Sequence, residues 1–404
     1  MIDLTNSMIY RIGNLDDENE RINYQMSTGK ILDKGSDDSV LYGRYLDIED
    51  DLRTYEGLKT QIEKTTAQND VADSTVAEVK KTYDDIKTDL LKSLNAGMSR
   101  TDMEAVATNI EGMRDNLISL SNTTIDDEYI FSGSNTTKQT YTKDKDFEVN
   151  GKVTFGGNAS LRNVAVEPGV YRDRGVTAHD IYMYNTDTTA ENEKISFTQN
   201  EIIRDDDGFT WKINDSGDKL EKLKLNGTPT SEYMALTDDG GDPKVYTTET
   251  ISDAKDNGHI KETTASGLEL EARHSVFDDL NEIINALKGY KTIREDGDDD
   301  GKQGDVATDE EVRDLLSKGL EKMSNQYDAT NVGHAELGGR NDIFNDALTS
   351  IDSKVTHYNI LMQETNGADM AKLAMESKSL EMTYQALYST VAKMNQLSIV
   401  NYLK

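Results

Sequence analysis

The sequence predicts an α+β fold: an elongated α-helical bundle or coiled coil formed by the N- and C-terminal segments, with a central antiparallel β domain inserted between them. Three observations support this prediction. Apolar residues recur three and four positions apart in both flanks of the chain, as on one face of a helix. The middle instead holds short alternating runs separated by Asn-Gly and Asp-Gly turn signals. All three prolines (Pro168, Pro229, Pro243) lie in that middle region, so the flanks lack this helix breaker.

The first predicted helix ends at Gly29, a residue type that suits a helix C-cap. Asn19 is a polar gap in its apolar face, which is formed by Met8, Ile12, Leu15, Ile22 and Met26. Short polar side chains follow at 35–39 and suit the N-cap of a second helix. Two long helices are then predicted over about 39–95 and 102–122, packed as a hairpin or bundle.

From about 129 to 268 the pattern becomes that of β-strands. Phe147–Val149 and Phe209–Ile213 alternate in the manner of strands, and Asn150-Gly151 and Asn226-Gly227 mark turns between such runs. This stretch predicts one antiparallel β domain, or one such domain with a second small β unit from about 190.

Helix returns over 276–287 and, after a polar loop at 291–308, from Val312 past Ala335. The last helix has the most regular pattern in the chain. Apolar residues fill two interleaved series of positions seven apart, broken only by Ser377: Met370, Leu373, Leu380, Tyr384, Leu387, Val391 and Met394. Such heptads predict a coiled-coil seam, and the alternative is the buried face of an ordinary bundle helix.

Charge is distributed unevenly along the chain. Residues 1–35 carry net −2 and 366–404 net +1, out of −32 for the whole chain. Nearly neutral amphipathic ends can pack against copies of themselves, whereas the acidic remainder is better placed facing water.

Composition also excludes several functions. A net charge of −32 repels nucleic acid and gains nothing at an anionic membrane surface. The absence of cysteine excludes disulfides, thiolate metal sites and cysteine nucleophiles. The N-terminus shows no basic segment, apolar run or cleavage signal, so we expect no cleaved signal peptide, and no apolar stretch is long enough to cross a membrane.

Candidate chemistry is sparse. Asp296, Asp298 and Asp300 stand at the first, third and fifth positions of a calcium-loop pattern, but its twelfth position is Ala307 instead of an acidic ligand. A solvated acidic loop is therefore the default reading, with calcium as a weak alternative. The five histidines show no ligand spacing, and no catalytic constellation is present. We expect a protein that is not an enzyme and needs no cofactor.

Four motifs resemble those of the flagellin and hook-associated protein superfamily. Gln25–Lys30 with Gly35–Ser39 resembles the family's N-terminal Ser-Thr-Gly-Lys and Ser-Asp-Asp-Pro signature, although Ser39 replaces its proline. Asp127–Ser134 resembles the segment that leaves the helical domain, and Ala335–Arg340 resembles Ala-Glu-Leu-Gly-Ala-Arg. Leu397–Leu403 is similar to the Leu-Ser-Leu-Phe-Asp-Tyr-Leu ending of hook–filament junction proteins, not to that of flagellins. The match covers about 1–185 and 270–404.

The resemblance implies a structural subunit of the bacterial flagellum that joins hook to filament. It also implies three domains. Residues 1–35 with 366–404 would form a terminal assembly domain, 36–140 with 270–365 a helical bundle, and 141–269 an outer β domain. A flagellin-type filament subunit and an extracellular surface-binding module are the alternatives. It further implies export through the flagellar type III channel to an extracellular location, with an export chaperone. The implied partners are copies of the chain and other axial proteins (a hook-side junction protein, flagellin), but neither nucleic acid nor membrane.

Assembly would use the terminal helices. Their apolar stripes are expected to stay unburied in the monomer, with partly disordered termini, until neighbouring subunits cover them. The predicted assembly residues are Met8, Ile12, Leu15, Ile22, Met26, Leu373, Leu380, Tyr384, Leu387, Val391 and Met394.

Overall fold

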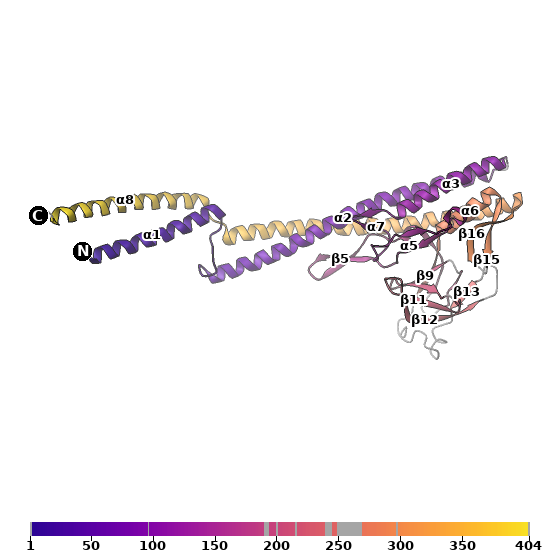
Figure 1. The fold of residues 1–404 in the computed structure, drawn as a ribbon, viewed down its shortest axis with the longest axis horizontal. Helices are drawn as coiled ribbons and strands as arrows, with labels where there is room; N and C mark the ends of the chain where they lie inside the picture. The colour runs from indigo at the N-terminus through magenta and orange to yellow at the C-terminus, as the bar shows by residue number, and fades with distance from the viewer. Residues whose placement is uncertain are drawn as a thin grey trace. The chain divides into compact units, whose positions relative to one another are not determined.

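Long helices form both ends of the chain and strands form its middle, so the predicted α+β class is confirmed (Figure 1). The structure, a computed structural model, describes residues 2–95, 97–189, 194–198, 201–214, 216–238, 245–248, 269–295 and 298–402, without the side chains of 2–6, 8, 148, 238, 245, 293–303 and 394–402. The chain divides into two compact units, residues 1–60 with 348–404 and residues 61–347. The finer division into three domains stays a prediction.

The first unit is helical. It contains α1 (Ile2–Thr28), α8 (Met370–Tyr402), the N-terminal part of α2 (Ser39–Ser93) and the C-terminal part of α7 (Asp309–Asn366). As predicted, α1 is followed by Gly29, whose φ of +69° is a left-handed conformation that glycine adopts without strain. In the same unit, the rings of Tyr55 and Tyr358 stack with their centroids 5.4 Å apart.

The second unit builds its main core from helices α2, α3 (Arg100–Ser121), α6 (Val276–Lys288) and α7. The predicted apolar faces lie in this core, with Val76, Val79, Tyr83, Ile86, Leu90, Ile110, Leu117, Leu280, Ile283, Leu316 and Met323 all buried. Helix α3 begins two residues earlier than expected because Ser99 caps it. The Ser99 Oγ accepts from Asp102 N at 3.2 Å, and the Asp102 carboxylate accepts from Ser99 N at 3.3 Å.

Three small hairpins connect α3 to the large sheet. They pair β1 (Thr124–Ile125) with β2 (Glu128–Tyr129), β3 (Tyr141–Lys143) with β4 (Val153–Phe155), and β5 (Arg162–Glu167) with β6 (Val170–Arg174). Two short helices, α4 (Phe147–Asn150) and α5 (Ala178–Ile181), lie between strands. The strand predicted at Phe147–Val149 is therefore wrong. Three residues are too few to establish a period, and the segment instead makes one helical turn that ends at left-handed Gly151.

Among the described residues, one antiparallel sheet of eight strands forms the centre of the β region. Its order is β7 (Met183–Thr188), β14 (Leu270–Ser275), β9 (Ile202–Asp205), β10 (Thr210–Ile213), β11 (Lys219–Leu223), β12 (Pro229–Asp238), β13 (Val245–Thr248) and β8 (Ser196–Thr198). The two end strands also meet, because Ser196 N on β8 donates to the Asp187 carboxylate on β7 at 3.1 Å. Trp211 and Phe197 lie in the buried core of the sheet. Strands on both sides of residue 190 share this sheet, which favours the single β domain over a separate second unit.

The polar loop predicted at 291–308 is wrong. A hairpin of β15 (Tyr290–Glu295) and β16 (Asp298–Val306) occupies most of that segment. Its aspartates and glycines are typical of loops, which hid the strand pattern from composition alone. Backbone pairing, for example Tyr290 with Val306, overrides these preferences.

A buried cluster of charged side chains joins the sheet to the helices of the second unit. Asp279 on α6 is fully buried, and its Oδ1 lies 3.0 Å from His274 Nε2 on β14 and 2.8 Å from Lys322 Nζ on α7. Burial alone would lower the pKa of His274, but the Asp279 carboxylate raises that pKa to about 9. The cluster therefore contains an imidazolium near neutral pH.

Candidate assembly site

Helices α1 and α8 pack against each other in the free chain. Ile22, Leu373 and Leu380 form a buried cluster, and Leu15 and Tyr384 pack against it. The expectation that these apolar stripes stay unburied in the monomer is therefore wrong for this part of the seam. The two apolar stripes bury each other within one chain, because α1 and α8 run antiparallel beside one another.

Polar contacts line the seam. Arg21 Nη2 lies 3.2 Å from a Glu376 oxygen. The Tyr384 hydroxyl donates to Asp16 Oδ1 at 2.6 Å, which raises the pKa of Tyr384 to about 12. Both contacts are exposed, so each contributes little to stability.

Four further predicted assembly residues lie outside the buried cluster. Ile12, Leu387 and Val391 are half-buried, and Met26 is exposed. The side chains of Met8 and Met394 lie outside the described residues. The sequence therefore identified the seam but could not separate its buried members from its accessible ones.

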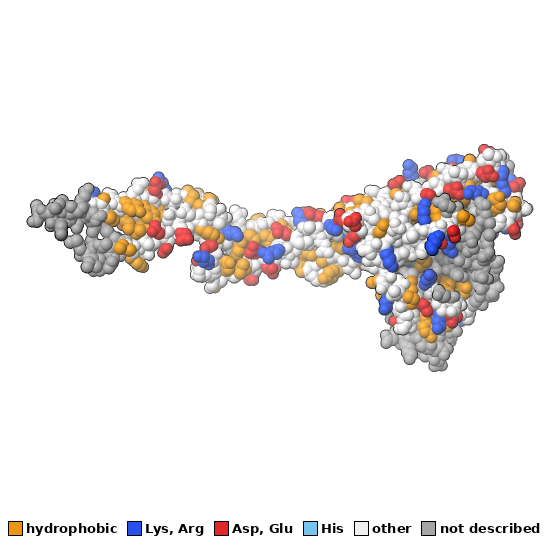
Figure 2. All heavy atoms as spheres, in the orientation of Figure 1, with side chains coloured by type: hydrophobic (Ala, Val, Ile, Leu, Met, Phe, Trp, Pro, Cys, Tyr) orange, Lys and Arg blue, Asp and Glu red, His pale blue; other side chains and the backbone are white. Residues whose placement is uncertain are grey.

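A second apolar face on α8 went unpredicted. Met375 and Met382 are 67% and 57% exposed. Met375 follows Leu373 by two residues and Met382 follows Leu380 by two, which corresponds to about 200° of helix rotation. The two methionines therefore point away from α1. With the exposed Ala371 and Ala386 they form what we call the methionine ridge. Figure 2 shows apolar side chains at the surface of the terminal helix pair. The signal was present in the sequence, because Met375 and Met382 are also seven apart.

A group of hydrogen bonds closes one end of the α1/α8 pair. The Asn366 carbonyl accepts from Ile31 N at 2.8 Å, and Asn366 Oδ1 accepts from Leu32 N at 2.7 Å. Ala368 N donates to the Gly29 carbonyl at 2.8 Å. We call the group formed by Gly29, Ile31, Leu32, Asn366 and Ala368 the polar clamp.

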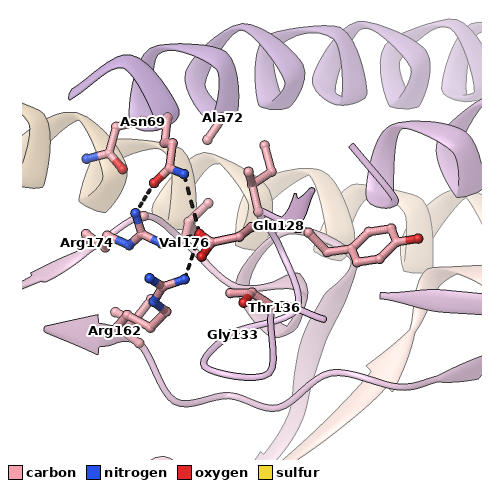
Figure 3. A pocket seen from close by; sticks show the side chains of 13 residues that line it. Asn69, Ala72, Glu128, Gly133, Thr136, Arg162, Arg174 and Val176 are labelled. Atoms are coloured by element: carbon pink, nitrogen blue, oxygen red, sulfur yellow. Dashed lines mark hydrogen bonds and ion pairs between the residues drawn. The ribbon is translucent and has the colours of Figure 1, made fainter. Parts of the chain in front are cut away.

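A recess in the second unit holds another polar group (Figure 3). One oxygen of Glu128 on β2 lies 2.8 Å from Arg162 Nη1 on β5 and 3.2 Å from Arg174 Nη2 on β6. Burial alone would raise the pKa of Glu128, but the two guanidinium groups lower it. Gln68 on α2 accepts a hydrogen bond from Arg174. These contacts attach the β5–β6 hairpin to α2, and we assign the recess this structural role.

The calcium prediction is untested. Asp296 lies outside the described residues, and Asp298 and Asp300 lie on β16 with side chains that the structure does not describe. Elsewhere in the described chain, no three His, Asp or Glu side chains group as metal ligands would. Among the described helices, none combines the length and apolarity that crossing a membrane requires.

Comparison with known proteins agrees with this architecture. Residues 4–136 match the bacterial flagellin N-terminal helical region. A putative flagellar hook-associated protein from Vibrio parahaemolyticus has a similar structure, with a TM-score of 0.50 and 12% identity over 82% of this chain and 100% of that one.

Two further solved structures align at lower scores. Flagellar hook-associated protein 3 from Legionella pneumophila has a TM-score of 0.48 and 11% identity over 78% of this chain and 97% of that one. FlgL from Xanthomonas campestris has a TM-score of 0.46 and 13% identity over the same shares. No curated protein sequence matches the chain. Residues 4–136 thus match the bacterial flagellin N-terminal helical region, and the chain has a fold similar to that of the putative hook-associated protein from Vibrio parahaemolyticus.

Proposed function

We propose that the chain is a structural subunit of the bacterial flagellum, placed at the hook–filament junction and assembled through its terminal helices. The observation that carries this proposal is the methionine ridge, an apolar surface on α8 that remains exposed after α1 has covered the other face. The N-terminal match, the fold shared with a putative hook-associated protein and the junction-type ending of the sequence support the same role.

The ridge would supply the association energy. Burying one exposed methionine side chain stabilises a contact by roughly 1.5–3 kcal/mol. Two methionines on every subunit would be buried repeatedly in an array of copies. Because the seam with α1 is already formed, the terminal pair would dock as one preformed element, which reduces the entropy lost on association.

The finer assignments are also proposals. The subunit would be exported and would act outside the cell. Its partners would be copies of itself, a hook-side junction protein and flagellin, with a chaperone before export. We propose no catalytic activity and no cofactor. The accessible members of the predicted set (Ile12, Met26, Leu387 and Val391) would join the ridge in contacts between subunits.

Immunogold electron microscopy of isolated flagella tests this proposal. An antibody raised against residues 141–269 would label the outer β domain. We expect gold confined to the boundary between hook and filament. Gold along the whole filament would favour a flagellin-type filament subunit instead, and absence from the flagellum would favour a surface-binding module.

A further inference from the structure

The apolar seam between α1 and α8 does not by itself fix how the two helices are aligned. Leu15 and Ile22 lie seven residues apart on α1, and Leu373, Leu380 and Leu387 lie seven apart on α8. Sliding one helix by seven residues, about 10 Å, would bring equivalent apolar side chains together again. A heptad pattern therefore selects a face of each helix and leaves several alignments of similar apolar burial.

The polar contacts along the seam are too weak to choose among these alignments. Arg21 and Glu376 have side chains that are 45% and 32% exposed. Exposed ion pairs contribute roughly 0–1 kcal/mol and weaken with salt. The contact of Tyr384 with Asp16 is exposed as well.

The polar clamp differs because Leu32 and Asn366 at its centre are buried and because its bonds involve the backbone. Asn366 is only 3% exposed, and it satisfies two successive backbone donors, Ile31 N and Leu32 N. Leaving a buried donor unpaired costs roughly 1–3 kcal/mol. If α1 slid along α8 by one heptad, both of these bonds and the bond from Ala368 N to the Gly29 carbonyl would be lost. The clamp therefore favours one alignment more strongly than the exposed contacts do.

The alignment of the helices follows directly from the clamp. Lys30 and Gly367 form an antiparallel bridge at the closed end. Arg21 lies nine residues before Lys30, and its partner Glu376 lies nine residues after Gly367. This ion pair therefore lies in the register that the bridge sets.

We infer that the polar clamp sets the register of α1 on α8, with Asn366 as its positioning residue. Register in turn fixes which part of α1 lies beside the methionine ridge when the ridge meets a neighbour. Only this consequence rests on the proposed function, because the register itself is a property of the free protein.

Pulsed electron-electron spin resonance on the full chain tests the inference. The chain has no cysteine, so two exposed positions, Asn19 on α1 and Lys393 on α8, can be replaced by cysteine and spin-labelled without background. Asn19 lies 11 residues before Lys30 and Lys393 lies 26 residues after Gly367, so the labels are staggered along the pair and a slide of one helix changes their separation. We expect a single narrow distance in the otherwise unchanged protein. Asn366→Ala removes the Oδ1 acceptor of Leu32 N and should add a population whose distance differs by up to about 10 Å, the length of one heptad. Asn366→Asp keeps the accepting oxygen and should restore the single distance.

Controls separate register from folding. Gln385→Ala alters an exposed amide on the same helix and should leave the distance unchanged. An unchanged narrow distance in Asn366→Ala would overturn the inference. So would loss of helical circular dichroism in that variant, because it would assign Asn366 to stability instead of register. If the distances shift as expected while immunogold labelling misses the flagellum, the proposed function fails and the register inference stands.

Discussion

Two side chains only two residues apart on α8 have opposite surroundings. Leu380 is 7% exposed and packs with Ile22, whereas Met382 is 57% exposed. Both are unbranched at Cβ and apolar, so residue type does not explain the difference. The position of each residue around the helix does. Substitutions at the two positions should therefore affect different processes.

An aspartate at each position separates folding of the terminal pair from assembly. Leu380→Asp places a carboxylate in the seam and should destabilise the α1/α8 pair by about 3 kcal/mol or more. Met382→Asp should leave the pair intact and weaken assembly at least tenfold. Circular dichroism would report the pair, sedimentation would report assembly, and Trp211 fluorescence should be unchanged in both, because Trp211 lies in the sheet core. Normal assembly of Met382→Asp would contradict the role of the ridge.

Two glycines, one inside α1 and one directly after it, should respond in opposite ways to substitution by alanine. Gly29 has φ +69°, so Gly29→Ala should destabilise the turn by about 1 kcal/mol. Gly13 lies inside α1 with open space around it, so Gly13→Ala should stabilise the helix by up to about 1 kcal/mol. Thermal unfolding followed by circular dichroism measures both. Equal shifts in the same direction would refute the conformational explanation.

At the scale of elements, periodicity predicted the helices well and composition predicted the loops poorly. Helices α1, α2 and α8 followed from apolar residues three, four and seven apart, because one buried face determines such elements. The β15–β16 hairpin did not follow, because backbone pairing forms it against the preferences of its aspartates and glycines.

The candidate site was predictable only in part, for a similar reason. The seam residues Ile22, Leu373 and Leu380 were identified by spacing. The polar clamp was not, since it joins Leu32 to Asn366 across the length of the chain and leaves no local pattern. Exposure of the methionine ridge likewise depends on which face α1 covers.

The stability of the β domain should fall at alkaline pH because of His274, which lies where β14, α6 and α7 meet. In the folded chain the pKa of His274 is about 9, whereas an unfolded histidine titrates near 6.5. Its contribution to stability is therefore fully present below about pH 6.5 and is lost as pH rises through about 9, with a magnitude of about 3 kcal/mol. Urea unfolding followed by Trp211 fluorescence at pH 6 and pH 10 measures this loss.

A variant identifies the group responsible. His274→Gln cannot carry the charge, so its stability should change much less between the two pH values. His357 is exposed in the first unit, and His357→Gln should behave like the unchanged protein. If His274→Gln loses as much stability between pH 6 and pH 10 as the unchanged protein, other groups cause the loss.

For the whole molecule, charge opposes association. The chain carries net −32, while residues 1–35 and 366–404 carry −2 and +1. Copies brought together by their terminal helices would repel one another through the acidic remainder. The Debye length falls from about 10 Å at 0.1 M salt to about 3 Å at 1 M, so salt should relieve this repulsion.

Assembly should consequently accelerate several-fold when sodium chloride is raised from 0.1 to 0.5 M. Light scattering measures the rate, and Trp211 fluorescence checks that the β domain stays folded. A decrease of the rate with salt would mean that attraction between opposite charges drives the contact.

The large sheet begins and ends at neighbouring strands. Met183 at the start of β7 pairs with Ser275 at the end of β14, so the chain enters the sheet and leaves it at nearly the same point. The segment between these two residues is therefore an insertion whose ends are adjacent. A short linker could replace it without stretching the backbone of the helices that it interrupts. Because its ends are adjacent, such an insertion can change in length without moving apart the helices that flank it.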